Sequence, residues 1–339
     1  KTQKGKGHGP SQADSANGGI IKGSKVTNND FLKSEKDKKP PYFACKALIE
    51  AAHLDPKIIL ISHSLTNQKS PFLAFRDLFP ERYIDAGVSE GHAISLSYVL
   101  AAQGYKPYVI LYSNMLQRVL DQALIDACLQ RYPIRFIIDH SSIVFHNVQH
   151  AGFFDTAFLG TLPNLLLMSP SSQESVTDII QFSAQELPSP CVIRLSKELW
   201  SLDIPHPPVE MAKGHYIQHG TKVGILSYGS VLKECIDATK LLEAHGISTT
   251  LADARFMQPI DEKMVFQMAK KHDVFVSVEE NSSGGLSSQV LRVVCKMGLL
   301  NDQFHYYPIF LKQIQGINQP PVVVTPEQIF HTIQTLLSF

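Results

Sequence analysis

Titratable side chains follow several apolar runs of the sequence, at the positions where strands of a sheet would end. Glu90 stands between an apolar run at 83–88 and an apolar helical stretch at 93–102. Tyr112 ends the next apolar run, and His140 comes directly after a third. An unpaired buried carboxylate is costly, so Glu90 is either neutralised by a neighbour or placed to act on a ligand.

Two further candidates lie at the same predicted edge. Arg194 is part of the run "CVIRLS" at 191–196, and His150 lies in the loop that follows His140. Each residue taken alone has an ordinary explanation: a strand arginine is usually in an ion pair or at the surface, and a carboxylate such as Glu90 at a helix start is favoured by the helix dipole. Ligands bind outside the carboxyl ends of strands in α/β sheets, so we interpret the convergence of these residues as one binding crevice.

Short apolar runs alternate with helical patterns from residue 41 onward, which predicts the elements that position these side chains. Runs that are apolar on both faces and separated by helices predict a parallel sheet covered on each side. A proline-rich segment at 203–214 separates this sheet from a second, smaller α/β unit. The expected strands lie at 58–63, 83–88, 108–113, 134–139, 165–169 and 191–196, and in the second unit at 223–228, 248–253, 274–280 and 307–311.

The domain organisation follows from shifts in composition. Residues 1–40 are rich in Lys, Gly, Ser and Asn and poor in apolar side chains, which predicts a tail or linker. We expect one domain at 41–202 and a second at 203–339. Because the sequence begins with Lys1 rather than methionine, we also expect it to be a piece of a longer protein.

The composition excludes several classes of partner. The 339 residues include 31 Lys plus Arg and 31 Asp plus Glu, so the net charge does not favour nucleic acid or a membrane surface. The five cysteines form no CxxC pair and no metal-ligand spacing, which favours a reducing compartment and predicts no metal ligands in this chain. No apolar window reaches the ~18 residues of a membrane span. We therefore expect a cytoplasmic protein with a small-molecule ligand.

Longer stretches of the sequence resemble a known family. "YIDAGVSEGHAISLSYVLAAQGYKP", "YSNMLQRVLDQ" and "QHAGFFDTAFLGTLPNLLLMSPSSQES" resemble the pyrimidine-binding domain of 1-deoxy-D-xylulose-5-phosphate synthases, which are transketolase-like thiamine diphosphate enzymes. "DARFMQPID" and "VSVEEN" resemble the last domain of that family, and "KTQKGKGHGP" resembles the segment that closes its first. The resemblance implies a transketolase-like pyrimidine-binding domain followed by a smaller transketolase C-terminal α/β domain. It also implies a preceding domain, outside this sequence, that holds Mg²⁺ and the diphosphate of the cofactor.

The resemblance assigns roles to the residues near the cofactor. Glu90 would hydrogen-bond to N1′ of the aminopyrimidine and favour the imino tautomer that takes the C2 proton. His150 would assist proton transfer or orient the bound intermediate. Tyr112 and Met115 would line the pyrimidine pocket, where Met115 replaces an aromatic residue that is usual in the family.

The resemblance also implies the reaction. Members of the family decarboxylate pyruvate and add the two-carbon unit to D-glyceraldehyde 3-phosphate, a step in isoprenoid and thiamine biosynthesis. Arg118, His140 and Arg194 would bind the phosphate of the acceptor, since a guanidinium fork matches phosphate geometry. The expected location is the bacterial cytoplasm, with a plastid as the alternative.

Several positions depart from the family pattern and leave alternatives open. His140 replaces an arginine, Gly91 replaces a glutamine, and the loop at 145–149 is shorter and bulkier than usual. The alternatives are a transketolase or 2-oxo acid dehydrogenase β-type enzyme with other substrates, and a non-catalytic relative. The retention of Glu90 argues against the last, because a module without cofactor gains nothing from a buried carboxylate.

Assembly is predicted from the second unit. The helical stretch that follows "VSVEENSSGGLSSQ" has apolar residues at Val290, Leu291, Val294 and Met297. An apolar face of this kind is unfavourable in water, so we expect a homodimer.

Overall fold

The computed structural model describes residues 39–63, 70–141, 152, 154–300, 304–311 and 323–338. Among them, a seven-stranded sheet has the order β10-β5-β6-β4-β3-β1-β2, and all of its neighbours pair in parallel except β10 and β5. Its strands are β1 Ile58–Ser62, β2 Tyr83–Asp85, β3 Lys106–Tyr112, β4 Arg135–Asp139, β5 Leu166–Met168, β6 Cys191–Arg194 and β10 Phe256–Gln258.

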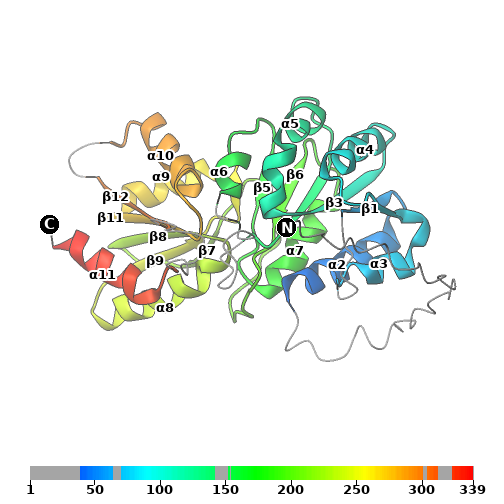
Figure 1. Ribbon diagram of the computed structural model, residues 1–339. Coiled ribbons are helices and arrows are strands. Elements are labelled where there is room, and N and C mark those ends of the chain that lie inside the picture. Colours follow the sequence, from blue (N-terminus) through cyan, green and yellow to red (C-terminus); the bar gives the residue numbers. More distant parts are fainter. Residues whose placement is uncertain are drawn as a thin grey trace, which may run out of the picture. The chain divides into compact units, whose positions relative to one another are not determined.

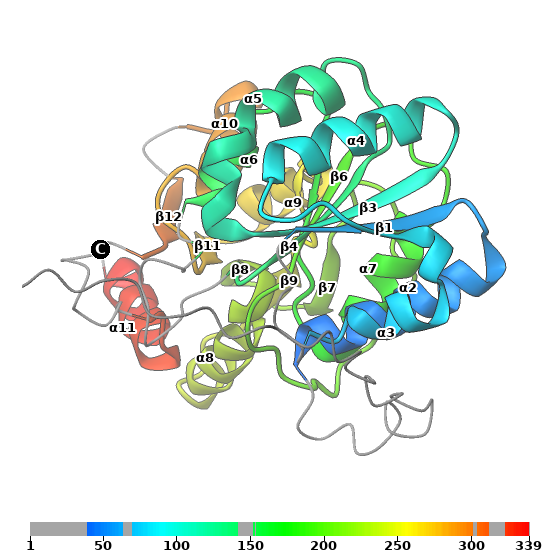
Figure 2. The same ribbon diagram turned by 45° about the vertical axis from the view of Figure 1, so that its right-hand side comes forward.

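Helices cover both faces of this first sheet, which is why its central strands are apolar on both sides. Figures 1 and 2 show α2, α3 and α7 on one face and α4, α5 and α6 on the other. The elements are α2 Pro40–Leu54, α3 Leu73–Leu78, the short 3₁₀ turn η2 Pro80–Arg82, α4 Glu90–Ala102, the 3₁₀ segment η3 Ser113–Val119, α5 Leu120–Gln122, the π-helical segment η4 Ala123–Cys128, α6 Asp155–Leu159 and α7 Gln173–Ser183.

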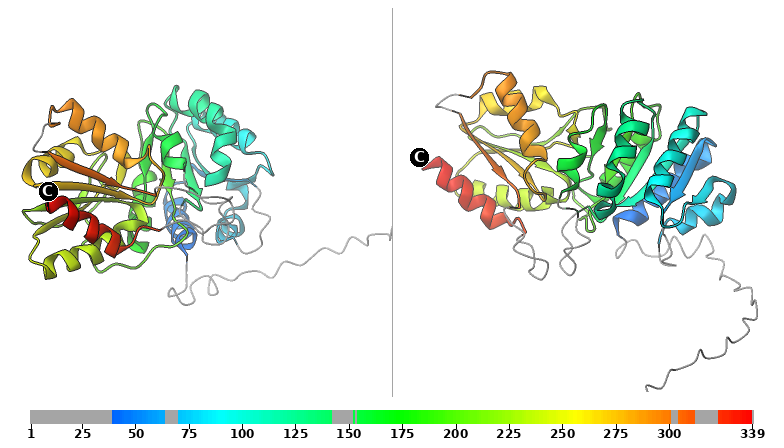
Figure 3. Two further views of the ribbon diagram at one scale, coloured as in Figure 1. Left: turned by 60° about the vertical axis from the view of Figure 1, so that its left-hand side comes forward. Right: turned by 45° about the horizontal axis from the view of Figure 1, so that its top comes forward.

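A second sheet of five strands, in the order β12-β11-β8-β9-β7, lies in the C-terminal part of the described chain. Four strands are parallel and the edge strand β7 is antiparallel to β9. Helices α8 and α11 cover one face, and α9 and α10 cover the other (Figure 3). The elements are β7 His215–Gln218, β8 Val223–Tyr228, the turn η6 Gly229–Val231, α8 Leu232–Ala244, β9 Thr249–Asp253, α9 Glu262–Lys271, β11 Val274–Glu279, α10 Leu286–Lys296, β12 His305–Ile309 and α11 Pro326–Leu337.

The fold class predicted from the sequence is confirmed: a helix-covered parallel sheet is followed by a smaller α/β unit. Each expected strand has a counterpart, displaced by a few residues at its ends. The sequence patterns missed β7 and β10. Strand β10 comes from the C-terminal part of the chain but pairs with β5 of the first sheet, with Phe256 opposite Met168. Two sheets that are separate in the sequence are therefore joined by backbone hydrogen bonds.

The apolar stretch of α10 proposed for dimerisation contains both buried core residues and exposed residues. Val290 and Val294 are fully buried, where they contribute to the core under α10, whereas Leu291 is 43% and Met297 is 37% exposed. Val290 and Val294 are therefore not available to a partner, because the helix uses one side of this stretch to cover its own sheet, and the expected homodimer stays a prediction. No helix in the described part of the chain is long and apolar enough to span a membrane.

Glu234, in the first turn of α8, gives the second unit a pH-dependent stability. Burial raises the pKa of its carboxyl to about 7, and the neighbouring Glu280 adds to the rise. A raised pKa in the folded state means that stability is fully present below the unfolded pKa of about 4.5 and is lost as the pH rises through about 7. We expect Glu234→Gln to raise the free energy of unfolding by about 1–2 kcal/mol at pH 8, a figure reduced for partial solvent exposure.

Urea unfolding at pH 5 and pH 8 measures this effect. The stability difference between Glu234→Gln and the parent should be present at pH 8 and largely absent at pH 5. Glu50→Gln, at an exposed position of α2, is the matched control and should change neither value. Equal stabilities for the parent and Glu234→Gln at pH 8 would show that the carboxylate is well solvated.

Candidate active site

Glu90 is the first residue of α4 and is only 7% exposed. Its Oε1 atom is buried and has no hydrogen-bond partner among the described residues; the nearest cation is Arg118, whose Nη1 lies 3.8 Å away. The helix N-terminus favours negative charge at this position, but it does not supply a donor to this oxygen. A buried carboxylate oxygen without a donor costs free energy, so the site favours a ligand that donates a hydrogen bond there.

His63 follows β1 directly and is 2% exposed. The backbone N–H of Tyr112 donates to His63 Nε2 at 3.4 Å, while Nδ1 has no partner among the described residues. Burial lowers the pKa of His63, with the charges of Glu90 and Asp85 opposing that change, so the ring is neutral at pH 7. In a neutral ring with Nε2 as acceptor, Nδ1 carries the proton. His63 thus presents a buried donor without an acceptor among the described residues, on a ring that feels the charge of Glu90.

The ring of Tyr112, the last residue of β3, contacts the rings of two histidines. Its ring meets that of His63 edge to face at 5.5 Å between centroids and that of His140 at 5.1 Å. Burial raises the pKa of the Tyr112 phenol, so it stays a neutral donor. Met115, in η3 just beyond this strand, is half-buried. The expected pocket residues Tyr112 and Met115 thus both lie at the carboxyl end of β3.

His140 occupies the turn after β4 with a left-handed backbone, φ 57°, a conformation that histidine adopts more readily than most residues. Its Nδ1 lies 3.3 Å from Asp139 Oδ2, and its backbone N–H donates to Asp139 Oδ1 at 2.7 Å. The ring lies against Tyr112 and its side chain is 35% exposed. His140 therefore stands at the mouth of the site with one side open to solvent.

Buried atoms without hydrogen-bond partners among the described residues near these strand ends include His140 Nδ1, which faces Asp139 Oδ2 at 3.3 Å. Three others lack such a neighbouring carboxylate: His63 Nδ1, Glu90 Oε1 and Gln122 Oε1. Gln122 closes α5 and lies next to Gly91, where an added Cβ would be 3.8 Å from its amide carbon. The π-helical segment that follows, in which Leu129 N–H bonds to Leu124 O at 2.9 Å, is a form often found at functional sites. The described atoms present one donor and two acceptors, a set that suits a ring carrying both kinds of group.

Arg118 and Arg194 differ sharply in their surroundings. The side chain of Arg118 is 66% exposed and its guanidinium lies near Glu90, so it can reach a ligand at the mouth of the site. Arg194 is 1% exposed, and its Nε donates to Asp155 Oδ2 at 2.8 Å. Its Nη2 donates to Asn281 Oδ1 at 2.6 Å and to Gly152 O at 3.3 Å. Arg194 is thus enclosed and paired with a carboxylate, and its expected role as a phosphate anchor stays a prediction.

The Arg194 network joins the two sheets. Asp155 begins α6, and Asn281 follows β11 in the second unit. Asn281 also donates to Thr156 Oγ1 at 2.6 Å. Burial raises the pKa of the Asp155 carboxyl, while Arg194 opposes this rise by favouring the charged form. Arg194 therefore holds α6 and the end of β11 together beneath the site.

Sequence reasoning missed His63 and Gln122. His63 ends the run "IILISH", so its position at a strand end was a usable signal. Gln122 gives no such signal, because it reaches the site through a helix. Lys197, three residues beyond Arg194, is half-buried at the end of β6 and was also overlooked. His150 lies outside the described residues.

Within the described residues no group of three or more His, Cys, Asp or Glu side chains could hold a metal ion, and all five cysteines are free thiols.

This chain has two α/β sheets and a buried glutamate at the edge of the first whose Oε1 accepts no hydrogen bond from the described residues, and it matches two domain families. Residues 44–201 match the pyrimidine-binding domain of transketolase, and residues 212–323 match the transketolase C-terminal domain. The chain therefore belongs to the transketolase-like thiamine diphosphate family.

Solved structures with the same fold include particular transketolases. A split gene transketolase, described as an inactive beta4 tetramer, is 22% identical with a TM-score of 0.77, over 88% of this chain and 98% of that one. A Pichia stipitis transketolase in complex with sedoheptulose-7-phosphate is 17% identical with a TM-score of 0.69, over 89% of this chain and 46% of that one. A transketolase variant from Pichia stipitis is 17% identical with a TM-score of 0.70 over the same shares. The chain spans about half the length of the Pichia stipitis enzymes, and the likeness at these identities is one of fold.

Proposed function

We propose that this chain supplies the pyrimidine-binding half of a thiamine diphosphate site, with Glu90 as the carboxylate that meets N1′ of the aminopyrimidine. The observation that carries the proposal is the buried Oε1 of Glu90, which lacks a donor among the described residues. A protonated ring nitrogen is the donor that this oxygen lacks. The neighbouring Nδ1–H of His63 and Oε1 of Gln122 complement the acceptor and donor groups of the same ring.

The bound cofactor would supply a carbanion at C2 of its thiazolium ring, and the residues of this chain would prepare it. Glu90 would hold a proton at N1′ and so would favour the imino form of the exocyclic nitrogen. His63 donates a hydrogen bond from Nδ1, and the Tyr112 ring limits the space beside it. The proposed Mg²⁺ and diphosphate ligands belong to the preceding domain that the sequence resemblance implies.

We further propose that the reaction is that of 1-deoxy-D-xylulose-5-phosphate synthase: decarboxylation of pyruvate and transfer of the two-carbon unit to D-glyceraldehyde 3-phosphate. The run "YSNMLQRVLDQ" supports this choice through its resemblance to that family. Arg118, with its exposed guanidinium, and His140, at the mouth, are the proposed contacts of the acceptor phosphate.

A transketolase reaction is the second candidate. The burial of Arg194 in an ion pair favours it, because one of the acceptor contacts expected for the first reaction is occupied by Asp155. The replacement of an arginine by His140 points the same way.

A homodimer remains part of the proposal, with the exposed Leu291 and Met297 of α10 as candidate contacts.

Identification of the product separates the two candidates. The completed enzyme is incubated with thiamine diphosphate, Mg²⁺ and one of two substrate pairs, either pyruvate with glyceraldehyde 3-phosphate or xylulose 5-phosphate with ribose 5-phosphate, and products are identified by mass spectrometry. We expect 1-deoxyxylulose 5-phosphate and CO₂ from pyruvate. Sedoheptulose 7-phosphate and glyceraldehyde 3-phosphate from the second pair, with no product from pyruvate, would instead assign the transketolase reaction. No product from either donor would support a non-catalytic relative.

His140→Arg tests the proposed phosphate contact. A guanidinium at this position would add a charge-assisted hydrogen bond to the acceptor phosphate, so we expect KM for glyceraldehyde 3-phosphate to fall roughly three- to tenfold while KM for pyruvate stays the same. Steady-state kinetics with each substrate varied in turn measures both values. If the two constants shift together, or neither shifts, His140 does not face the phosphate. Arg131→Lys, at an exposed turn, is the control.

A further inference from the structure

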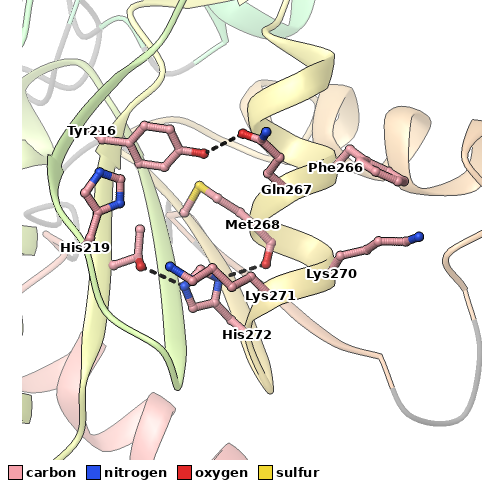
Figure 4. A pocket seen from close by; sticks show the side chains of 9 residues that line it. Tyr216, His219, Phe266, Gln267, Met268, Lys270, Lys271 and His272 are labelled. Carbon is pink, nitrogen blue, oxygen red and sulfur yellow. Dashed lines mark hydrogen bonds between the residues drawn. The ribbon is translucent and has the colours of Figure 1, made fainter.

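A hollow in the second unit lies apart from the strand ends that form the candidate active site. It has a volume of about 450 Å³ and is lined by Tyr216, His219, Thr250, Phe266, Gln267, Met268, Lys270, Lys271 and His272 (Figure 4). The volume is within the range of roughly 300–1,000 Å³ that is usual for small-molecule sites. It opens between the edge strand β7 and helix α9, since β7 is short and its side chains are only half-buried.

An irregularity in the edge strand places two rings on the same side of the hollow. The register of β7 against β9 shifts between Tyr216 and Gln218, as in a β-bulge. A bulge re-aims the side chains that follow it. His219 consequently lies beside Tyr216, with ring centroids 4.8 Å apart and planes inclined by 34°. The two tilted rings lie against each other at one side of the hollow, and Met268 reaches toward Tyr216 from α9 (Figure 4).

The floor of the hollow is a fixed and neutral hydrogen-bond chain. His272 Nδ1 lies 2.8 Å from Met268 O, and its Nε2 lies 2.7 Å from Thr250 Oγ1. Thr250 Oγ1 in turn accepts from the N–H of Gly220 at 2.8 Å. Burial lowers the pKa of His272, so the floor is polar but uncharged at pH 7.

All the charged residues that line the hollow are basic. Lys271 extends over His272, whereas Lys270 points away, with its Nζ 4.8 Å from the centre of the Phe266 ring (Figure 4). No Asp or Glu is among the lining residues. Lysines in the last turn of a helix also complement its dipole, but that role needs no aromatic rings opposite. One accessible ammonium group and a pair of aromatic rings suit a ligand with an anionic end and an aromatic ring.

We propose that this hollow binds small aromatic phosphates of the nucleoside monophosphate class. The ring of the ligand stacks against the half-exposed rings of Tyr216 and His219, and its phosphate meets Lys271. This site is independent of the function proposed above, because none of its residues contributes to the candidate active site.

Calorimetric titration of the chain with adenosine 5′-monophosphate tests the proposal, with adenosine, ribose 5-phosphate and inorganic phosphate as separate probes. We expect the monophosphate to bind, and to bind at least about tenfold more tightly than each of the other three, since each of these lacks the ring or the anion. If inorganic phosphate or adenosine binds as tightly as the complete nucleotide, or if the nucleotide does not bind, the proposal is overturned.

Variants of the lining residues test whether the nucleotide binds in this hollow. Lys271→Gln should weaken binding of the monophosphate roughly tenfold, and Tyr216→Leu roughly three- to tenfold. Tyr216→Phe keeps the ring and should bind like the parent, which separates loss of the ring from loss of folding. Lys263→Gln lies on the same helix outside the hollow and is the matched control. Binding that is unchanged in both Lys271→Gln and Tyr216→Leu would place the nucleotide elsewhere and overturn the assignment.

Discussion

Glu90→Gln is expected to slow exchange of the C2 proton of bound thiamine diphosphate by roughly two to four orders of magnitude, the usual contribution of a positioned acid or base. The amide retains the shape of the side chain but cannot share a proton with a ring nitrogen. Quenched-flow NMR measures the exchange in the enzyme completed with its proposed diphosphate-binding domain. The turnover number should fall in parallel.

Folding is expected to survive this change, because Glu90 Oε1 makes no hydrogen bond to the described residues that an amide would break. The thermal midpoint of Glu90→Gln should therefore be equal to or above that of the parent. Glu81→Gln, at an exposed position of the same sheet unit, is the control and should leave exchange unchanged. Exchange at the parent rate in Glu90→Gln would remove Glu90 from the proposed site.

Arg194→Met is expected to lower the free energy of unfolding by about 3–5 kcal/mol, because it leaves the buried carboxylate of Asp155 without its cation. Typical domains have only about 5–15 kcal/mol in total, so the variant should unfold at much lower urea concentration. The 2.8 Å contact between Arg194 Nε and Asp155 Oδ2, with both side chains at most 2% exposed, is the reason.

Two further variants test this explanation. Arg76→Met removes a solvent-exposed partner of Asp77 and should cost less than about 1 kcal/mol. The double variant Arg194→Met with Asp155→Leu removes both charges and should recover part of the loss. A stability close to the parent in Arg194→Met, accompanied by a higher KM for the phosphorylated substrate, would return Arg194 to the phosphate-binding role.

The strands were predictable because parallel strands covered on both faces must be apolar along their whole length, as in β1 and β8. Strand β10 was not, because a three-residue segment that completes a distant sheet has no periodic signal of its own. The sequence singled out Glu90 as a candidate because a charge between two apolar elements is conspicuous, and its burial at the start of α4 agrees with that position.

The environment of Arg194 could not be predicted in the same way. An arginine in a strand gives the same sequence pattern whether its side chain faces a ligand or a buried carboxylate. Its partners Asp155 and Asn281 are 39 and 87 residues away along the chain. The split of α10 into core positions such as Val290 and exposed positions such as Leu291 has the same origin, because adjacent apolar residues can serve opposite sides of a helix.

The pyrimidine half of thiamine, 4-amino-5-hydroxymethyl-2-methylpyrimidine, tests the central claim most directly because it needs no diphosphate site. Saturation-transfer NMR follows its binding to the parent chain and to Glu90→Gln. We predict binding to the parent with a Kd on the order of 1 mM, and roughly tenfold weaker binding to Glu90→Gln as the charge-assisted hydrogen bond is lost. Equal binding to both chains, or no binding to the parent, would contradict the assignment of Glu90 to the cofactor ring.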